Sequence, residues 1–465
     1  MEAEEMERYD LVLRGGQVVT AGGEGLADLA IHGGRIAQIG GAMSGADEID
    51  AAGKLVLPGG IDAHVHLSLI DEMLDGPRWC DDFASGTAAA AAGGITAVGN
   101  MTFPREGESM RDAVLRDAAD ADAMAIVDVF LHPVLTDPKT QPLDDIDALA
   151  AEGVTSLKFF TSFAGFTETP APYVEAMRRA REAGAITLIH CEDEAIMTDA
   201  MRHLIATGMT GVEHYPETRP VTAEAAATAR IVNFVDETGA PTYIVHLSSA
   251  AALEEVRRGR GRGLPIWVET RPLYLHLTAE RFQEPDGAKY AGQPPLRTLD
   301  DRISLWNGLA AGEIDTVCSD HAPWMLVDKV KPDMDMRDVI AGVADLDTML
   351  PMLFSEGVIA GRISLQQFVA ASSTNAAKLF GLFPRKGTIA IGADADIAIW
   401  DPELTKPVRS TELATHSDYS PYEGWEVSGW PVVTIHGGEV VYRDGKLMGK
   451  PGRAGIVKRG PTGAL

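Results

Sequence analysis

The central part of the chain alternates short apolar runs with alanine-rich stretches, and this alternation constrains the fold more than any other feature. Each apolar run is followed by a polar turn and a helical stretch, which is the pattern of βα units in a parallel sheet. Helical stretches include 83–92, 110–123, 173–183, 223–238 and 250–258. Eight strands with crossover helices predict an α/β fold, a TIM-type (β/α)8 barrel. The eight apolar runs are 61–65, 96–101, 125–131, 156–160, 186–189, 242–245, 265–269 and 315–318.

Composition excludes several classes of protein. Apolar residues make up 45% of the 465 residues and charged residues 23%, as in ordinary globular proteins. The net charge of −28 would repel a phosphate backbone or an anionic membrane surface, so we expect no nucleic-acid partner and no membrane association. Residues 1–10 are polar and acidic, and no apolar run is long enough to span a membrane, which predicts a cytoplasmic protein.

The three cysteines do not form a disulfide framework, because their number is odd and they lie far apart in the sequence. They are Cys80, Cys191 and Cys318. We expect small buried thiols. A role as a soft metal ligand is the alternative for Cys191 and Cys318, which lie beside candidate ligands.

The candidate metal-binding residues stand within or just after five of the eight apolar runs. The carboxyl ends of barrel strands carry the active site in this architecture, and imidazole and carboxylate groups bind divalent metals. The alternative is a set of satisfied core histidines and buried ion pairs, which would have to arise independently five times. The pattern therefore predicts a metal site built from His64, His66, Lys158, His190, His246 and Asp320.

Lys158 stands among Leu157, Phe159 and Phe160, where an unpaired cation would be costly. Burial lowers the pKa of a lysine, and a neutral amine can add carbon dioxide to form a carbamate. The two carbamate oxygens could then bridge two metal ions. The alternative is an ion pair between Lys158 and Asp320 or another buried carboxylate.

Blocks of sequence along almost the whole chain resemble the cyclic amidohydrolases, and within them the dihydropyrimidinase and hydantoinase branch. The resemblance implies a barrel at 58–385 and a small β-sandwich shared by 1–57 and 386–465, the latter with a C-terminal tail. Short alternating strands and glycine turns at both ends agree with that division. The blocks are GGIDAHVHL from Gly59, DDFASGTAAAAAGG from Asp81, SLKFF around Lys158, IHCEDE from Ile189, VHLSSAAALEEV from Val245, QPPLR from Gln293, SDHAP from Ser319, and STNAAKLFGLFPRKGTIAIGADADIAIWDP from Ser373.

The resemblance also implies a binuclear centre in which carboxylated Lys158 bridges two divalent metal ions, zinc above manganese, cobalt or iron. A hydroxide between the metals would open a cyclic amide to a carbamoyl amino acid, with Asp320 as general base and acid. The family further implies a homotetramer. In this interpretation His64, His66 and Asp320 hold one metal, and His190 and His246 hold the other.

Two positions depart from the family pattern. Phe163 replaces the tyrosine whose hydroxyl stabilises the oxyanion, and loss of one such donor commonly costs ~100-fold in turnover. Gln293 replaces a serine that binds substrate through its main chain, a contact that tolerates the change. Ser68 stands where dihydroorotases carry an arginine, which disfavours that activity. Either another donor serves in place of the tyrosine, or the substrate differs.

Several assignments stay open at this point. A hydrophobic substrate pocket is one interpretation of Leu69, Ile70, Met73, Leu74, Trp79, Phe166 and Trp324, and packing or an oligomer interface is the other. Arg271 either contacts an anionic substrate or forms a salt bridge, and His132 is expected to support the site without ligating metal. The alternative functions are an allantoinase-like or other cyclic imide or ureide hydrolase, and a non-catalytic scaffold.

Overall fold

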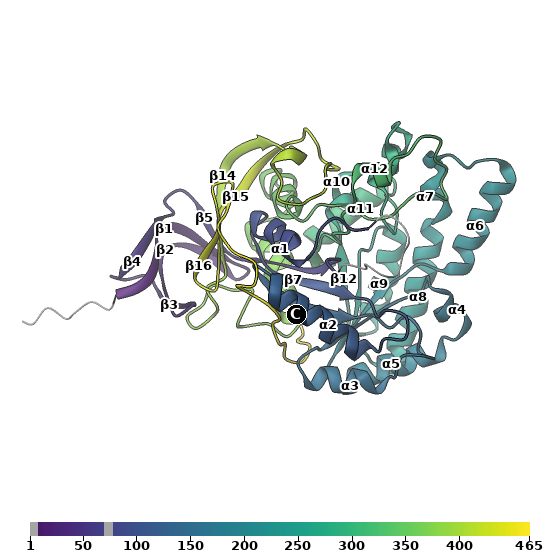
Figure 1. Ribbon diagram of the computed structural model, residues 1–465, viewed down its shortest axis with the longest axis horizontal. Helices are drawn as coiled ribbons and strands as arrows, with labels where there is room; N and C mark the ends of the chain where they lie inside the picture. Colours follow the sequence, from purple (N-terminus) through teal and green to yellow (C-terminus); the bar gives the residue numbers. More distant parts are fainter. Residues whose placement is uncertain (1–7, 69–77) are drawn as a thin grey trace, which may run out of the picture.

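The computed structural model describes residues 8–68 and 78–465. It shows a body of strands and surrounding helices with a sheet attached at one end (Figure 1). Strands from both ends of the chain, coloured purple and yellow-green, make that sheet.

Eight parallel strands form the barrel, as the alternating sequence pattern predicts. Hydrogen bonds join three of them in the order β6-β7-β8 and five in the order β13-β12-β11-β10-β9. Parallel bridges from Val134 to Lys158 and from Val65 to His321 connect the two groups and close the ring. The strands are β6 (Gly60–Val65), β7 (Ile95–Thr102), β8 (Asp128–Pro133), β9 (Ser156–Phe160), β10 (Ile186–His190), β11 (Thr242–Ile244), β12 (Ile266–Thr270) and β13 (Thr316–Val317).

Helices cover the outside of these strands (Figure 1). The first has the predicted bounds, and Asp82 and Ser85 form a capping box at its start. In the described part of the chain, no helix is both long and apolar enough to cross a membrane. The helices are α1 (Phe83–Ala92), α2 (Met110–Met124), α3 (Asp144–Ala151), α4 (Ala164–Glu168), α5 (Ala171–Glu182), α6 (Glu194–Thr207), α7 (Tyr215–Thr218), α8 (Val221–Thr238), α9 (Ala250–Gly261), α10 (Pro272–His276), α11 (Leu299–Ala310), α12 (Leu326–Lys329), α13 (Met349–Leu353), α14 (Leu365–Val369) and α15 (Asn375–Leu379).

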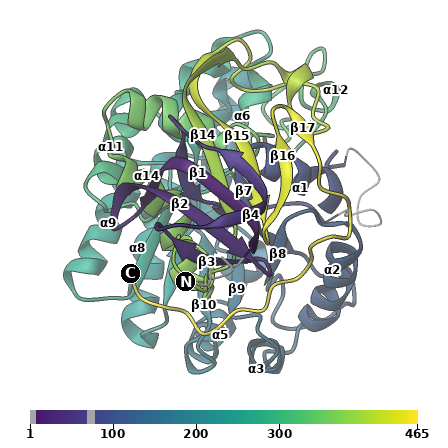
Figure 2. The same cartoon turned by 90° about the vertical axis from the view of Figure 1, so that its left-hand side faces the viewer.

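The attached sheet combines both chain ends because β5 pairs with β1 on one side and with β14 on the other. Its strand order is β17-β16-β15-β14-β5-β1-β2-β3, with β4 paired to β1, and its apolar side chains form a core of their own. Figure 2 shows this sheet face-on. Its strands are β1 (Arg8–Thr20), β2 (Gly23–His32), β3 (Arg35–Ile39), β4 (Ser44–Asp50), β5 (Leu55–Pro58), β14 (Ile397–Pro407), β15 (Glu426–His436), β16 (Glu439–Arg443) and β17 (Lys446–Leu447).

After β17 the chain returns along the barrel as the yellow trace of Figure 2. Ile456 forms a parallel bridge with Val129 of β8, and the backbone of Thr462 donates to the carbonyl of Gly184. Arg459 is buried and donates to the carbonyl of Leu131. The C-terminal tail is therefore part of the packed structure and holds the end of the barrel where the strands begin.

Candidate metal centre

The predicted ligands gather at the carboxyl ends of the barrel strands. His64 lies in β6, His190 ends β10, and His246 and Asp320 follow β11 and β13. His246 and Asp320 have φ angles of 39° and 50°. Such left-handed backbone is uncommon outside glycine and concentrates at functional sites, so these strand ends are held in position by the surrounding fold.

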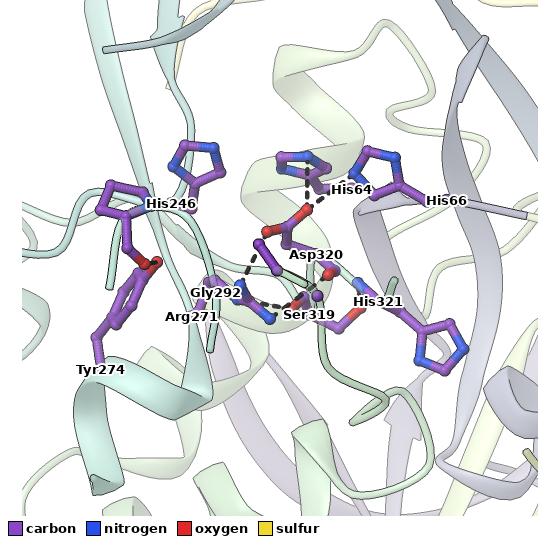
Figure 3. Close-up of polar contacts among 12 residues, drawn as sticks. His64, His66, His246, Arg271, Tyr274, Gly292, Ser319, Asp320 and His321 are labelled. Carbon is purple, nitrogen blue, oxygen red and sulfur yellow. Dashed lines mark hydrogen bonds and ion pairs between the residues drawn. The ribbon is translucent and has the colours of Figure 1, made fainter. Parts of the chain in front are cut away.

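Three of these side chains meet around one carboxylate oxygen (Figure 3). Asp320 Oδ1 lies 3.1 Å from His64 Nε2 and 2.9 Å from His66 Nε2. All three residues are buried, and their ligand atoms lie within 4.8 Å of one another. The arrangement can hold a divalent cation through two imidazoles and one carboxylate.

A second pair of histidines lies beside this group. His190 Nδ1 is 3.0 Å from His246 Nε2, and the rings of His64 and His246 are 5.5 Å apart. Burial lowers the pKa of both His190 and His246, which keeps their imidazoles neutral, as metal ligation requires. The structure therefore brings all five predicted histidine and aspartate ligands into one site as two adjoining groups.

Two glutamates that the sequence reasoning did not single out orient the histidines. Glu269 Oε1 is 2.9 Å from His64 Nδ1, and Glu192 Oε2 is 2.8 Å from His190 Nε2. Each carboxylate occupies one ring nitrogen and leaves the other facing the site. A carboxylate at the end of an apolar strand, as in Glu269, is the signal that could have revealed the first of them.

Lys158 lies in β9, close enough to both groups to act on His66 and His190 through its charge. It is 0% exposed, and its Nζ has no hydrogen-bond partner within residues 8–68 and 78–465. Burial lowers its pKa to about 8, against the opposing charges of Glu269 and Asp320. Asp320 pairs instead with Arg271, so the alternative of a Lys158–Asp320 ion pair finds no support. A buried amine whose lowered pKa makes the neutral form accessible, beside converging nitrogen and oxygen donors, fits a lysine that carries a carbamate.

A cavity of about 220 Å³ opens onto these residues. Phe163 lies at its wall and stacks on Phe160 with ring centroids 4.5 Å apart, and Gln293 lies at the wall as well. Among the described lining residues, Ser162 is the only one with a hydroxyl group. The lining residues are His64, His66, Trp79, Phe103, Phe160, Ser162, Phe163, His190, His246, Gln293, Asp320, Ala322, Ala341 and Gly342.

The hydrophobic-pocket interpretation is only partly correct. Trp79 lines the cavity, but Phe166 is buried against Phe159 and Tyr173 because its helix turns it into the core. Trp324 lies behind Trp79, with ring centroids 6.2 Å apart. The remaining members of that prediction, at 69–74, lie outside the described residues.

The structure decides between the interpretations that were left open for Arg271 and His132. Arg271 is fully buried and forms a salt bridge with Asp320, so the salt-bridge interpretation holds. His132 binds Ser156 Oγ through Nδ1 at 2.8 Å and packs against Phe130 and Phe380, away from the lining of the cavity. It supports the barrel interior beneath the metal centre.

The expectation of buried thiols is correct for two of the three cysteines, whereas Cys80 is only partly buried. Cys191 and Cys318 are buried, and all three cysteines are free. Burial raises the pKa of both buried thiols, which disfavours the thiolate that a metal ligand requires.

Comparison with known proteins agrees with this geometry. The model of the family described as "Amidohydrolase family" matches residues 55–441. The chain belongs to the amidohydrolase family. It is 37% identical to a D-hydantoinase of Ralstonia pickettii over 97% of this chain and 99% of that relative.

Two further members of the amidohydrolase family are similar over nearly their full length. A D-phenylhydantoinase of Escherichia coli O1:K1 is 36% identical over 97% of this chain and 98% of that relative. The crystal structure of a dihydropyrimidinase from Brevibacillus agri NCHU1002 superimposes with a TM-score of 0.93 at 34% identity, covering 98% and 99% of the two chains. The predicted family, barrel and sheet domain are confirmed.

Proposed function

We propose that this protein hydrolyses a cyclic amide of the hydantoin or dihydropyrimidine type to a ring-opened carbamoyl amino acid. The observation that carries the proposal is the buried amine of Lys158, which has no hydrogen-bond partner among the described residues and lies close to two groups of converging ligands. The family membership and the names of the similar hydantoinases support the same reaction class.

We propose a binuclear centre, with zinc as the metal and Lys158 carboxylated. His64, His66 and Asp320 would hold one ion, and His190 and His246 the other. Two bound cations would supply an activated water and polarise the ring carbonyl. The protein itself contributes the orientation of the imidazoles, through Glu269 and Glu192, and a 220 Å³ cavity that opens onto them.

Asp320 is the proposed general base and acid. Its carboxylate lies at the floor of the cavity, where it can take a proton from the attacking water and return it to the leaving ring nitrogen. Gln293 lines the same cavity, and its backbone is the proposed main-chain contact to the ring.

The phenyl ring of Phe163 donates no hydrogen bond, and this favours a second candidate function. A cyclic imide or ureide hydrolase, allantoinase-like in substrate, would share the metal chemistry and differ in the pocket around Phe163. The test is hydrolysis of hydantoin, dihydrouracil, allantoin and succinimide by zinc-loaded protein under one set of conditions. Turnover of hydantoin or dihydrouracil supports the first proposal, turnover of allantoin or succinimide alone supports the second, and failure on all four contradicts both.

We further propose that segments 1–57 and 386–465 form a domain distinct from the barrel at 58–385, and that the protein is a homotetramer. The pairing of β5 with β1 and β14 supports the division. Light scattering coupled to gel filtration tests the assembly, since a tetramer of 49.6 kDa chains is well separated from a monomer or dimer.

A further inference from the structure

Arg271 lies directly behind Asp320, on the side away from the histidines (Figure 3). It stands between β12 and α10 and is 0% exposed. It is not among the described residues that line the cavity, so it is not placed to bind substrate. A guanidinium buried so completely needs a counter-charge, and Asp320 provides it.

The two oxygens of Asp320 are divided between different partners. Arg271 Nη1 is 2.9 Å from Oδ2, whereas Oδ1 faces the Nε2 atoms of His64 and His66. Arg271 also donates from Nε to the carbonyl oxygen of Ser319 at 3.0 Å. The contact with Ser319 fixes the rigid guanidinium relative to the backbone before Asp320. The carboxylate therefore cannot turn about its own axis without losing its contact with Nη1.

Gly292 leaves the space that this guanidinium occupies. A Cβ atom at position 292 would lie 2.9 Å from Arg271 Nη1, closer than a Cβ atom approaches a neighbouring heavy atom, so the guanidinium would have to shift. The backbone of Gly292 is held in turn by Tyr215, whose hydroxyl donates to the Gly292 carbonyl at 3.2 Å. A glycine at 292 and an arginine at 271 are therefore matched to each other.

We propose that Arg271 is a positioning residue of the metal centre: it fixes the carboxylate of Asp320 with Oδ1 toward His64 and His66, and Gly292 provides the room for it. This role rests on the proposed function, because it concerns how tightly the first metal is held. It does not depend on which ring the enzyme opens.

The test is the zinc affinity of purified protein, measured by competition with a chromogenic chelator. Arg271→Met removes the charge and the planar guanidinium but keeps a side chain of similar length, and we expect the zinc held by His64, His66 and Asp320 to bind about 10- to 100-fold less tightly, as for other partners of metal ligands. Arg271→Lys keeps the charge and is expected to recover part of the loss. The matched control is Arg260→Met, which breaks an ion pair with Asp315 at the opposite end of the barrel; it is expected to alter thermal stability but not zinc affinity.

A second variant keeps the proposal testable if Arg271→Met folds poorly. Gly292→Ala leaves Arg271 in place and is expected to weaken zinc binding by itself, because its Cβ displaces the guanidinium. If Arg271→Met folds, Gly292→Ala is expected to have little further effect in that background. Wild-type zinc affinity in folded Gly292→Ala or in folded Arg271→Met would overturn the role. Wild-type protein that binds no zinc would instead contradict the proposed function itself.

Discussion

At the scale of single residues, carboxylate partners determine which ring nitrogen of His64 and of His190 faces the site. Glu269 and Glu192 hold one nitrogen each of His64 and His190. The histidines themselves could be predicted from the sequence, because each lies at or just after the end of an apolar strand. Glu192 could not, because an acidic residue in the polar turn that follows a strand is unremarkable until the fold brings it against a histidine.

Trp79 is the residue that we expect to replace the missing tyrosine hydroxyl. Its Nε1 is buried at the cavity wall without a hydrogen-bond partner in the described part of the chain, and its ring lies 4.9 Å from that of His66. Trp79→Phe keeps the shape and removes the donor, so kcat should fall about 100-fold with metal content unchanged. Steady-state kinetics of Trp79→Phe and Ser162→Ala checks this. Full activity in Trp79→Phe with a large loss in Ser162→Ala would assign the donor to the serine instead.

At the scale of elements, the strands are predicted within a few residues because buried parallel strands require continuous apolar runs. The run predicted at 242–245 appears as β11 (Thr242–Ile244), and that at 156–160 as β9 (Ser156–Phe160). Phe166 shows what the sequence cannot provide. An aromatic residue near a strand end suits a pocket or a core equally well, and only the packing of α4 decides between them.

Lys329 joins two loops that line the cavity. Its buried Nζ donates to the carbonyls of Ala291, Ile340 and Gly342 at 2.9, 2.7 and 2.6 Å. Lys329→Met would leave three buried carbonyls without their donor, at about 1–3 kcal/mol for each one that finds no replacement. We expect the free energy of unfolding to fall by at least about 2 kcal/mol in urea titrations. The exposed Lys331→Met is the matched control, and equal stability of the two variants would contradict this role.

At the scale of the whole molecule, Asp81 links the barrel to the segment that leads into β15. Its carboxylate accepts from the backbone N–H of His416 at 2.9 Å and lies 2.9 Å from His321 Nε2. Burial raises the pKa of Asp81, but the hydrogen bond and charge of His321 outweigh it, and the pKa falls from 3.8 to about 2. The carboxylate therefore binds fewer protons in the folded state than in the unfolded state near pH 3.

This difference predicts a specific acid dependence. A depressed pKa gives stability that is complete above about pH 4 and is lost as pH falls toward 2, worth about 2 kcal/mol in total. We expect the free energy of unfolding to fall less steeply across that window in Asp81→Asn than in the wild type. If the free energy of unfolding falls equally steeply with decreasing pH in the two proteins, Asp81 does not contribute.

A second ionic contact joins the two parts of the molecule. The Lys386 ammonium lies 2.6 Å from Asp128 at the start of β8 and also pairs with Asp396 beside β14. Although Asp128, Asp396 and His436 are close enough to hold a cation, Lys386 already supplies the positive charge there. Lys386 is thus a buried lysine paired with carboxylates, whereas the amine of Lys158 has no hydrogen-bond partner among the described residues.

Metal content is the measurement that tests whether Lys158 assembles a binuclear metal centre. Wild-type protein and Lys158→Ala are purified with zinc and bicarbonate, dialysed together, and analysed for bound metal, with circular dichroism to confirm that the variant is folded. We expect two metal ions per wild-type chain, and we expect Lys158→Ala to lose both the metal pair and the activity. Two metal ions per chain in folded Lys158→Ala would contradict this expectation.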